Sequence, residues 1–240
     1  MGGVPAAALV CAVVLCAGLC VGTGRQVFAA EPEAGPIAKA FGEAYSERVP
    51  DPFPPAALVS PGRAAGVAQA GAAKGACPVL LDYRMVDLRG RRIDLCAFKG
   101  KVLLLVNTAS FCGYTPQYRG LEALQERYGA AGLVVMGFPT NDFGAQEPGS
   151  NAQIQDFCEA TYGVRFPMFG KVTVRGADKA PLFVRLTALP TPQAASGDIA
   201  WNFEKFLLDR EGRLIARFRS AVEPESAEVL TLLRAALGQS

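Results

Sequence analysis

The sequence predicts an α/β domain in which a central mixed sheet is flanked by helices. Two apolar segments, Val102–Val106 and Leu133–Phe138, have the composition of buried strands. Between them, Pro116–Tyr128 repeats apolar residues every three to four positions, as a helix does. A strand, a helix and a strand in this order are expected to form a parallel pair with a right-handed crossover. Hairpin signals on both sides of this unit add antiparallel partners and make the sheet mixed.

The segment before the strand–helix–strand unit predicts a short hairpin. Val79–Val86 and Arg92–Leu95 flank a turn at Arg89–Gly90. In the unit itself, Pro116 suits a first helical position, where a missing N–H is not needed, and Gly129 provides the stop signal. The chain therefore enters the central strand from an antiparallel pair.

The second half predicts further helices and one more hairpin. Ser150 and Gln153 form a capping box that starts a helix through Cys158. The later elements are a short segment at Phe166–Phe169, a helix from Pro181 through Leu186, a hairpin of Phe206–Asp209 and Leu214–Phe218, and a closing amphipathic helix, Glu225–Leu237. A sheet of four or more strands with helices on both faces fits this order, and a thioredoxin-like fold is the simplest such architecture.

The composition divides the chain into three parts. Residues 1–30 contain a nearly unbroken apolar run, which predicts a signal peptide or, alternatively, a retained membrane anchor. Residues 31–76 are rich in Ala, Gly and Pro and are expected to be a disordered linker, because they cannot bury enough apolar surface to fold. Residues 77–240 carry nearly all the apolar runs and form the predicted domain. We therefore expect an exported protein, periplasmic or extracytoplasmic, with a possible membrane tether.

Charge and residue usage exclude several function classes. The net charge is +2 and the basic residues form no long runs, which argues against nucleic-acid binding. Histidine is absent, which excludes Ser–His and Cys–His catalysis and the usual zinc and haem sites. We expect neither a cofactor nor a metal, and any nucleophile must be activated by dipoles, amides or other charges.

Four of the seven cysteines lie in the predicted domain: Cys77, Cys96, Cys112 and Cys158. An exported domain permits disulfides, and four cysteines allow three complete pairings, among which the sequence does not choose. Cys96, at the end of an apolar strand, is interpreted as a core residue. A Cys77–Cys96 bridge is the alternative.

Cys112 occupies the position that suggests chemistry. It follows a buried strand and a small-residue turn, and it precedes a helix that begins at Pro116. The free N–H groups and the positive dipole end of a helix N-terminus favour a thiolate over a thiol. The sequence therefore predicts a reactive cysteine here.

Three motifs resemble those of the glutathione peroxidase family. They are VNTASFCGYTPQYRGLEALQERY around Cys112, GFPTNDFGAQEPGS at residues 137–150 and WNFEKFLLDREG at residues 201–212. The resemblance covers residues 77–240 and implies a thioredoxin-like fold and thiol peroxidase activity towards hydrogen peroxide or organic hydroperoxides. It also implies that Cys112 is the peroxidatic residue and that Trp201 and Asn202 donate hydrogen bonds to its sulfur.

Asp142 departs from the family pattern, because the second motif usually has Gln at this position. An ionised Asp142 near Cys112 would raise the thiol pKa and oppose activation. If Asp142 is turned away, Asn141 or Gln146 takes over as the donor. On the first alternative, replacing Asp142 by Gln raises the peroxidase rate.

Cys158 resembles the resolving cysteine of the two-cysteine, thioredoxin-dependent branch of the family. The resemblance implies that Cys112 is oxidised to a sulfenic acid and then forms a disulfide with Cys158, which requires local unfolding near residues 150–162. It further implies a thioredoxin-type reductant in preference to glutathione. The short connection Ala188–Gly197 implies a monomer whose open site admits lipid hydroperoxides.

Two other functions remain open at this stage. One is a disulfide oxidoreductase that relays oxidation to a partner protein. The other is a non-catalytic family member whose site is weakened by Asp142.

Overall fold

The structure is a computed structural model that describes residues 76–239. The predicted signal or anchor segment and nearly all of the predicted linker lie outside the described residues. Among the described residues, no helix is long and apolar enough to cross a membrane.

The central sheet has four strands in the order β4-β3-β5-β6. Strand β3 (Val102–Thr108) pairs in parallel with β4 (Leu133–Pro139) and antiparallel with β5 (Lys205–Leu208), which pairs antiparallel with β6 (Leu214–Phe218). The predicted mixed sheet and the parallel β3–β4 pair are confirmed. Every residue of β3 is buried, as expected for the central strand of a sheet covered on both faces.

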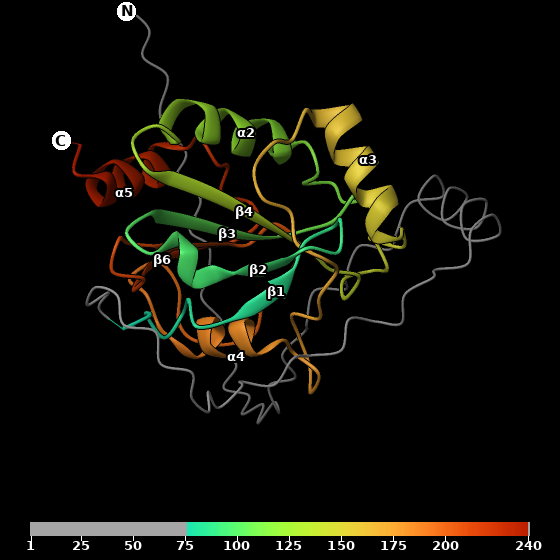
Figure 1. Ribbon diagram of the computed structural model, residues 1–240, viewed down its shortest axis with the longest axis horizontal. Helices are drawn as coiled ribbons and strands as arrows, with labels where there is room; N and C mark the ends of the chain where they lie inside the picture. Colours follow the sequence, from blue (N-terminus) through green and yellow to red (C-terminus); the bar gives the residue numbers. More distant parts are fainter. Residues whose placement is uncertain (1–75, 240) are drawn as a thin grey trace, which may run out of the picture. The chain divides into compact units, whose positions relative to one another are not determined.

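Helices cover the two faces of the sheet separately (Figure 1). Helices α2 (Gln117–Tyr128) and α5 (Ala227–Leu237) lie on one face, and α4 (Pro181–Ala188) lies on the other. Alternate residues of β3 serve the two cores: Leu104 packs towards α2 and α5, and Leu105 packs towards α4. Helix α3 (Asn151–Tyr162) adds Ile154 and Cys158 to the first core.

The predicted first hairpin is present but shorter than expected. Strands β1 (Arg84–Val86) and β2 (Arg92–Asp94) form a separate two-stranded sheet, and the short 3-10 helix η1 (Leu95–Phe98) follows directly. The chain before Arg84 is not strand, because the N–H of Leu81 donates to the carbonyl of Pro78 and closes a turn.

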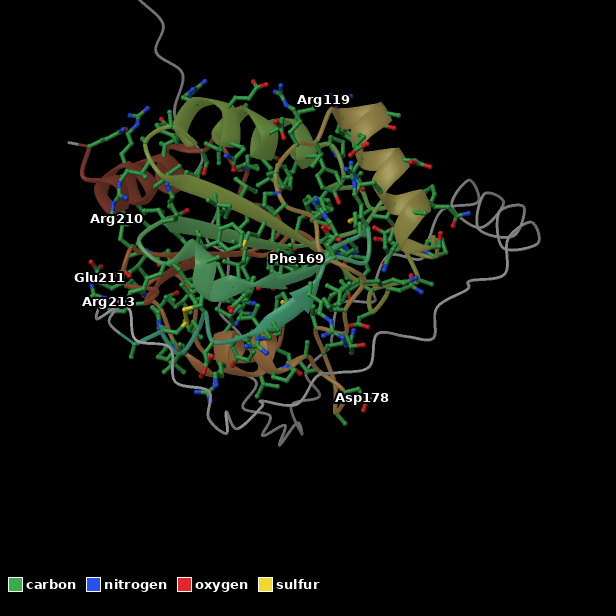
Figure 2. The ribbon with its side chains drawn as sticks, in the orientation of Figure 1. Arg119, Phe169, Asp178, Arg210, Glu211 and Arg213 are labelled. Carbon is green, nitrogen blue, oxygen red and sulfur yellow. A yellow bond between two sulfur atoms is a disulfide. The ribbon has the colours of Figure 1, made fainter. Side chains whose placement is uncertain are left out.

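The second hairpin is held by the carboxylate of Asp209. This carboxylate accepts from the backbone N–H groups of Glu211 and Arg213 and from the Arg213 guanidinium. Figure 2 shows Glu211 and Arg213 at this turn, with Arg210 beside them. Arg210 donates to the carbonyl of Gly100, just before β3, and to the carbonyl of Ala131, just before β4. These two hydrogen bonds fix the hairpin against the starts of both strands.

The other predicted elements are also found. Ser150 caps α3, and both hydrogen bonds of the predicted capping box with Gln153 are present. The segment at Phe166–Phe169 is not a strand of the sheet; it makes isolated bridges, with Met168 beside Gly137 and Phe169 beside Asp87. The thioredoxin-like α/β fold predicted from the sequence is therefore confirmed.

Candidate active site

Cys112 lies in the turn between β3 and α2, where the sequence predicted it. Its backbone N–H donates to the Thr115 hydroxyl at 3.0 Å, and that hydroxyl donates to the Ala109 carbonyl at 2.9 Å. The threonine thus ties both sides of the turn together and fixes the backbone of Cys112. The side chain is free and only 7% exposed.

Burial dominates the electrostatics of Cys112. It raises the pKa of the thiol above its ordinary value, and the backbone N–H of Tyr114 and the side chains of Trp201 and Asn202 partly oppose this by stabilising the thiolate. The Tyr114 N–H lies 3.4 Å from the sulfur. The predicted activation at a helix N-terminus was therefore incomplete: helix position alone does not offset the desolvation of a nearly buried sulfur, and the other donors matter.

Asn107, at the end of β3, positions the segment that carries Trp201 and Asn202. Its side-chain amide donates to the carbonyl of Trp201 at 3.1 Å and accepts from the N–H of Glu204 at 3.0 Å. Its backbone carbonyl accepts from the N–H of Phe203, which has a positive φ of 64°. Asn107 is fully buried, and the sequence reasoning missed it. Its position at the end of the central strand, within the first motif, was the available signal.

Glu204 anchors the same segment from the other side. Both its carboxylate and the guanidinium of Arg217 are fully buried, and they form an ion pair at 2.8 Å. The carboxylate also accepts from the N–H of Ala200 at 2.7 Å and pairs with Arg219. A buried charge that is paired and fully hydrogen-bonded holds its surroundings in one arrangement, here the turn of Trp201 and Asn202.

Asp142 is not placed against Cys112. Its carboxylate accepts from the backbone N–H groups of Val174, at 2.6 Å, and Arg175, at 3.2 Å. It thereby joins its loop to the chain before α4. The alternative in which Asp142 is turned away therefore describes the structure, and the concern that its charge opposes a thiolate at Cys112 loses its basis.

Gln146, and not Asp142, is the residue of this loop whose side chain contacts Asn202. It is 5% exposed, and its side-chain oxygen accepts from the Asn202 amide at 3.0 Å. Its backbone carbonyl accepts from the N–H of Phe111, the residue before Cys112. The sequence analysis named Gln146 only as an alternative donor. Its position in the same motif, directly before the Glu-Pro-Gly sequence, does not by itself favour Gln146 over Asp142.

Cys158 is a free thiol on α3 and is 1% exposed. Burial raises the pKa of Cys158 to about 12, the Tyr118 hydroxyl lowers it, and the charges of Glu147 and Glu159 raise it further. The two free cysteines belong to the same core but to different elements. Burial therefore disfavours the thiolate form of Cys158 in this structure.

Contacts at its C-terminal end fix α3 to the rest of the domain. Glu159 forms a salt bridge with Arg89 of the first hairpin at 2.7 Å. The guanidinium of Arg119, on α2, lies 5.0 Å from the centre of the Tyr162 ring; Figure 2 shows Arg119 on the side of α2 that faces α3. The Arg89–Glu159 ion pair is exposed, and exposed ion pairs contribute at most about 1 kcal/mol.

Cys77 and Cys96 form a disulfide with their Cα atoms 5.8 Å apart. The interpretation of Cys96 as a core residue was wrong: it is half-buried and bonded to Cys77 at the start of the described chain. The structure contains none of the three complete pairings: among the four cysteines of the domain it has this single bridge, and Cys112 and Cys158 are thiols. Residues 76–239 contain no group of three or more Cys, Asp or Glu side chains that could hold a metal ion.

Known proteins match most of this domain. Residues 80–187 match the sequence model of the glutathione peroxidase family. The hydroperoxy fatty acid reductase of Synechocystis sp. is 50% identical over an alignment of 153 residues, and the alignment covers 61% of this chain and 90% of that protein. The chain belongs to the glutathione peroxidase family. The glutathione peroxidase of Lactococcus lactis (46% identical, 61% of this chain, 93% of that protein) and the glutathione peroxidase-like peroxiredoxin of Schizosaccharomyces pombe (46%, 61% and 92%) agree.

Two solved structures have the same fold as this domain. The crystal structure of Trgpx in its apo form is 36% identical, covers 67% of this chain and 96% of that one, and gives a TM-score of 0.52. The crystal structure of T. cruzi GPX1 is 29% identical, covers 67% of this chain and 97% of that one, and gives 0.53. The protein is accordingly a thiol peroxidase of this family, as the motifs implied.

Proposed function

We propose that this peroxidase works through a two-cysteine cycle in which Cys112 is oxidised and Cys158 resolves. The observation that carries the proposal is the set of donors on the Cys112 sulfur: the Tyr114 N–H and the side chains of Trp201 and Asn202. Donors aimed at a buried sulfur stabilise the thiolate, which is the form that attacks peroxide. The same donors can hold the hydroxide or alkoxide that leaves.

The chemistry of each half-cycle is balanced by the two cysteines and the peroxide. The Cys112 thiolate attacks one peroxide oxygen and the O–O bond breaks, which forms a sulfenic acid on Cys112. The departing hydroxide or alkoxide takes up the proton that the thiol had released and leaves as water or an alcohol. The Cys158 sulfur then displaces the hydroxyl group as water and forms the disulfide. Because Cys158 is 1% exposed on a capped helix, this step requires α3 to loosen. The weak, exposed ion pair of Glu159 is consistent with such loosening.

The proposed reductant is a thioredoxin-type protein. Two of the relatives, from Schizosaccharomyces pombe and Saccharomyces cerevisiae, are named glutathione peroxidase-like peroxiredoxins. A protein dithiol reduces the Cys112–Cys158 disulfide by attack on one sulfur and release of the other. Glutathione is the alternative reductant. It suits the cycle less well, because Cys158 already attacks the sulfenic acid and no small thiol is needed for that step.

The proposed substrates include lipid hydroperoxides as well as hydrogen peroxide. The relative from Synechocystis is named a hydroperoxy fatty acid reductase. In this chain, α4 ends at Ala188 and the connection to Gly197 is short, without a long insertion. A monomer with an open site remains the expectation.

Export of the protein is also a proposal, with a possible membrane tether through residues 1–30. The Cys77–Cys96 disulfide supports it, because stable disulfides are typical of oxidising compartments. With Asp142 turned away from Cys112, nothing in the site favours the non-catalytic alternative. The relay to a partner protein remains testable with the same assay as the peroxidase.

A coupled assay tests the proposed function. The full chain, supplied with thioredoxin, thioredoxin reductase and NADPH, is expected to consume hydrogen peroxide and a fatty-acid hydroperoxide with multiple turnovers. Replacing the thioredoxin system by glutathione and its reductase is expected to give slower turnover. Faster turnover with glutathione would contradict the proposed reductant. Rapid oxidation of a dithiol protein without peroxide consumption would favour the relay.

A further inference from the structure

An aromatic contact joins the two segments that carry the redox cysteines. The ring of Phe111, the residue before Cys112, and the ring of Phe157, the residue before Cys158, have their centroids 6.2 Å apart. The planes of the two rings are tilted by 33° to each other. This separation is within the range at which aromatic side chains attract each other. The residues beside the two cysteines are thus in direct contact, from the turn before α2 to helix α3.

Phe111 is the fixed side of this contact. Its backbone N–H donates to the carbonyl of Gln146 at 3.0 Å, which ties it to the loop after β4. The N–H of the next residue, Cys112, donates to the Thr115 hydroxyl, also at 3.0 Å. Figure 1 shows α3 at the same end of the sheet as this turn from β3 to α2. Phe111 therefore presents its ring to α3 from a backbone that is held on both sides.

Phe157 belongs to the helix that has to loosen in the proposed cycle. The same turn of α3 places its ring against Phe111 and the Cys158 side chain in the core. The Phe157 ring also lies 5.7 Å from the Tyr162 ring, and the Tyr162 ring lies 5.4 Å from that of Tyr118 on α2, again between centroids. Because Phe157 and Cys158 are neighbours in the chain, a turn that unwinds to release Cys158 also takes Phe157 away from Phe111.

The contact between the two phenyl rings differs from the contacts at the ends of α3. The capping box stabilises the start of the helix. The Glu159–Arg89 ion pair and the contact of Arg119 with Tyr162 hold its last turns. None of these contacts involves the turn that carries Cys112. They stabilise the helix, whereas the ring contact also fixes the middle of the helix against the segment of the peroxidatic cysteine.

We propose that Phe111 and Phe157 form a latch that sets the rate of the resolving step. The two rings hold α3 in the closed position, in which Cys158 is 1% exposed, and they separate before Cys158 reaches Cys112. The inference rests on the proposed two-cysteine cycle and deepens it. Phe111 and Phe157 are positioning residues of that cycle, since they act through the place of Cys158 and not on the peroxide.

The latch determines how long the sulfenic acid on Cys112 persists. Two reactions compete for this sulfenic acid. Cys158 converts it to the disulfide and water, or a second hydrogen peroxide oxidises it to a sulfinic acid and is itself reduced to water. The rate of the second reaction rises with the peroxide concentration, and the rate of the first does not. A latch that slows resolution therefore lowers the peroxide concentration at which Cys112 is lost as the sulfinic acid.

Rapid-quench kinetics of the full chain, with Cys112 and Cys158 reduced, test this inference. The protein is mixed with hydrogen peroxide, quenched by alkylation at millisecond intervals and digested, and mass spectrometry quantifies the Cys112–Cys158 disulfide and the sulfinic acid. In Phe157→Ala, we expect the disulfide to form about two- to tenfold faster, which is the factor that one aromatic pair contributes to a local opening equilibrium. The rate of the first oxidation should stay unchanged. At high peroxide, the yield of sulfinic acid should fall.

Further variants make the test specific to the two rings. Phe157→Tyr keeps the ring and is expected to resolve at the wild-type rate. Phe111→Ala removes the contact from the fixed side and is expected to speed resolution like Phe157→Ala, with little further gain when the two are combined. It also serves if Phe157→Ala fails to fold. Glu159→Gln breaks the exposed ion pair of the same helix, and its effect is expected to be equal with and without the Phe111 ring.

The outcomes separate this inference from the proposed function. Resolution at or below the wild-type rate in the two alanine variants, or effects of the two that simply multiply when combined, would overturn the latch and leave the cycle intact. A wild-type protein that forms no Cys112–Cys158 disulfide would overturn the cycle itself.

Discussion

The domain contains two pairs of cysteines that differ in everything except residue type. Cys77 and Cys96 are half-buried, near the surface, and already bonded to each other. Cys112 and Cys158 are buried in the core, lie on separate elements and remain thiols. The comparison teaches that geometry decides which pair is structural: Cα atoms 5.8 Å apart can be bridged without movement. In the proposed cycle, the second pair is bridged only after local unfolding around α3, so that it can open and close.

Replacing Cys112 should have the largest effect. Cys112→Ser puts a hydroxyl in place of the thiol, and a hydroxyl beside these donors is not deprotonated at neutral pH. We expect peroxide consumption to fall to the uncatalysed background, as measured by stopped-flow. Cys96→Ser, which breaks the other pair, is the matched control and should keep the peroxidatic rate. Loss of the peroxidatic rate in the control alone would reverse the roles of the pairs.

Replacing Cys158 should stop turnover while leaving the first step intact. Cys158→Ala is expected to consume about one equivalent of peroxide per protein and then to stall with thioredoxin as the reductant. Mass spectrometry should find Cys112 as a sulfenic acid or its further oxidation products. Multiple turnover at the wild-type rate would show that Cys158 does not resolve.

Breaking the structural pair should lower stability and not activity. The bridge closes a loop of about 20 residues, for which chain entropy predicts a stabilisation of about 3 kcal/mol. We expect Cys77→Ala combined with Cys96→Ala to lower the free energy of unfolding by roughly this amount in urea titrations. Its resolving and peroxidatic rates should match the wild type. An unchanged midpoint would mean that the bridge contributes nothing to the fold.

The smallest effect is expected at Asp142. The sequence analysis placed Asp142 near Cys112, whereas in the structure its carboxylate binds the backbone of Val174 and Arg175. Asp142→Gln should leave the peroxidatic rate unchanged and should lower the free energy of unfolding by about 1 kcal/mol, because its carboxylate accepts two backbone N–H groups. Gln146→Glu, which puts a carboxylate beside Asn202, should slow the peroxidatic step instead. A faster rate in Asp142→Gln would return Asp142 to the site.

The sequence predicted the parts of the fold that depend on local pattern. The strand–helix–strand unit, the capping box at Ser150 and the hairpin at Glu211–Gly212 follow from periodicity and turn chemistry, and all three are found. The strand boundary before Arg84 was missed because a turn closed by Leu81 interrupts an apolar run. Local pattern cannot reveal such an interruption.

The parts of the site that depend on tertiary contacts were predicted less well. Resemblance located Cys112, Trp201, Asn202 and Cys158 because they stand in recognisable motifs. It could not decide between Asp142 and Gln146, since both lie in one loop and only its path shows which side chain faces Asn202. The Cys77–Cys96 bridge and the Phe111–Phe157 contact likewise join segments far apart in the chain.

Peptide mapping after one equivalent of peroxide tests the central claim most directly. The reduced full chain, with Cys77–Cys96 intact, is mixed with hydrogen peroxide, quenched by alkylation and digested. The account predicts a new Cys112–Cys158 disulfide in most molecules, with the Cys77–Cys96 peptide unchanged. Alkylated Cys158 together with sulfinic acid on Cys112, or exchange between the two pairs, would contradict it.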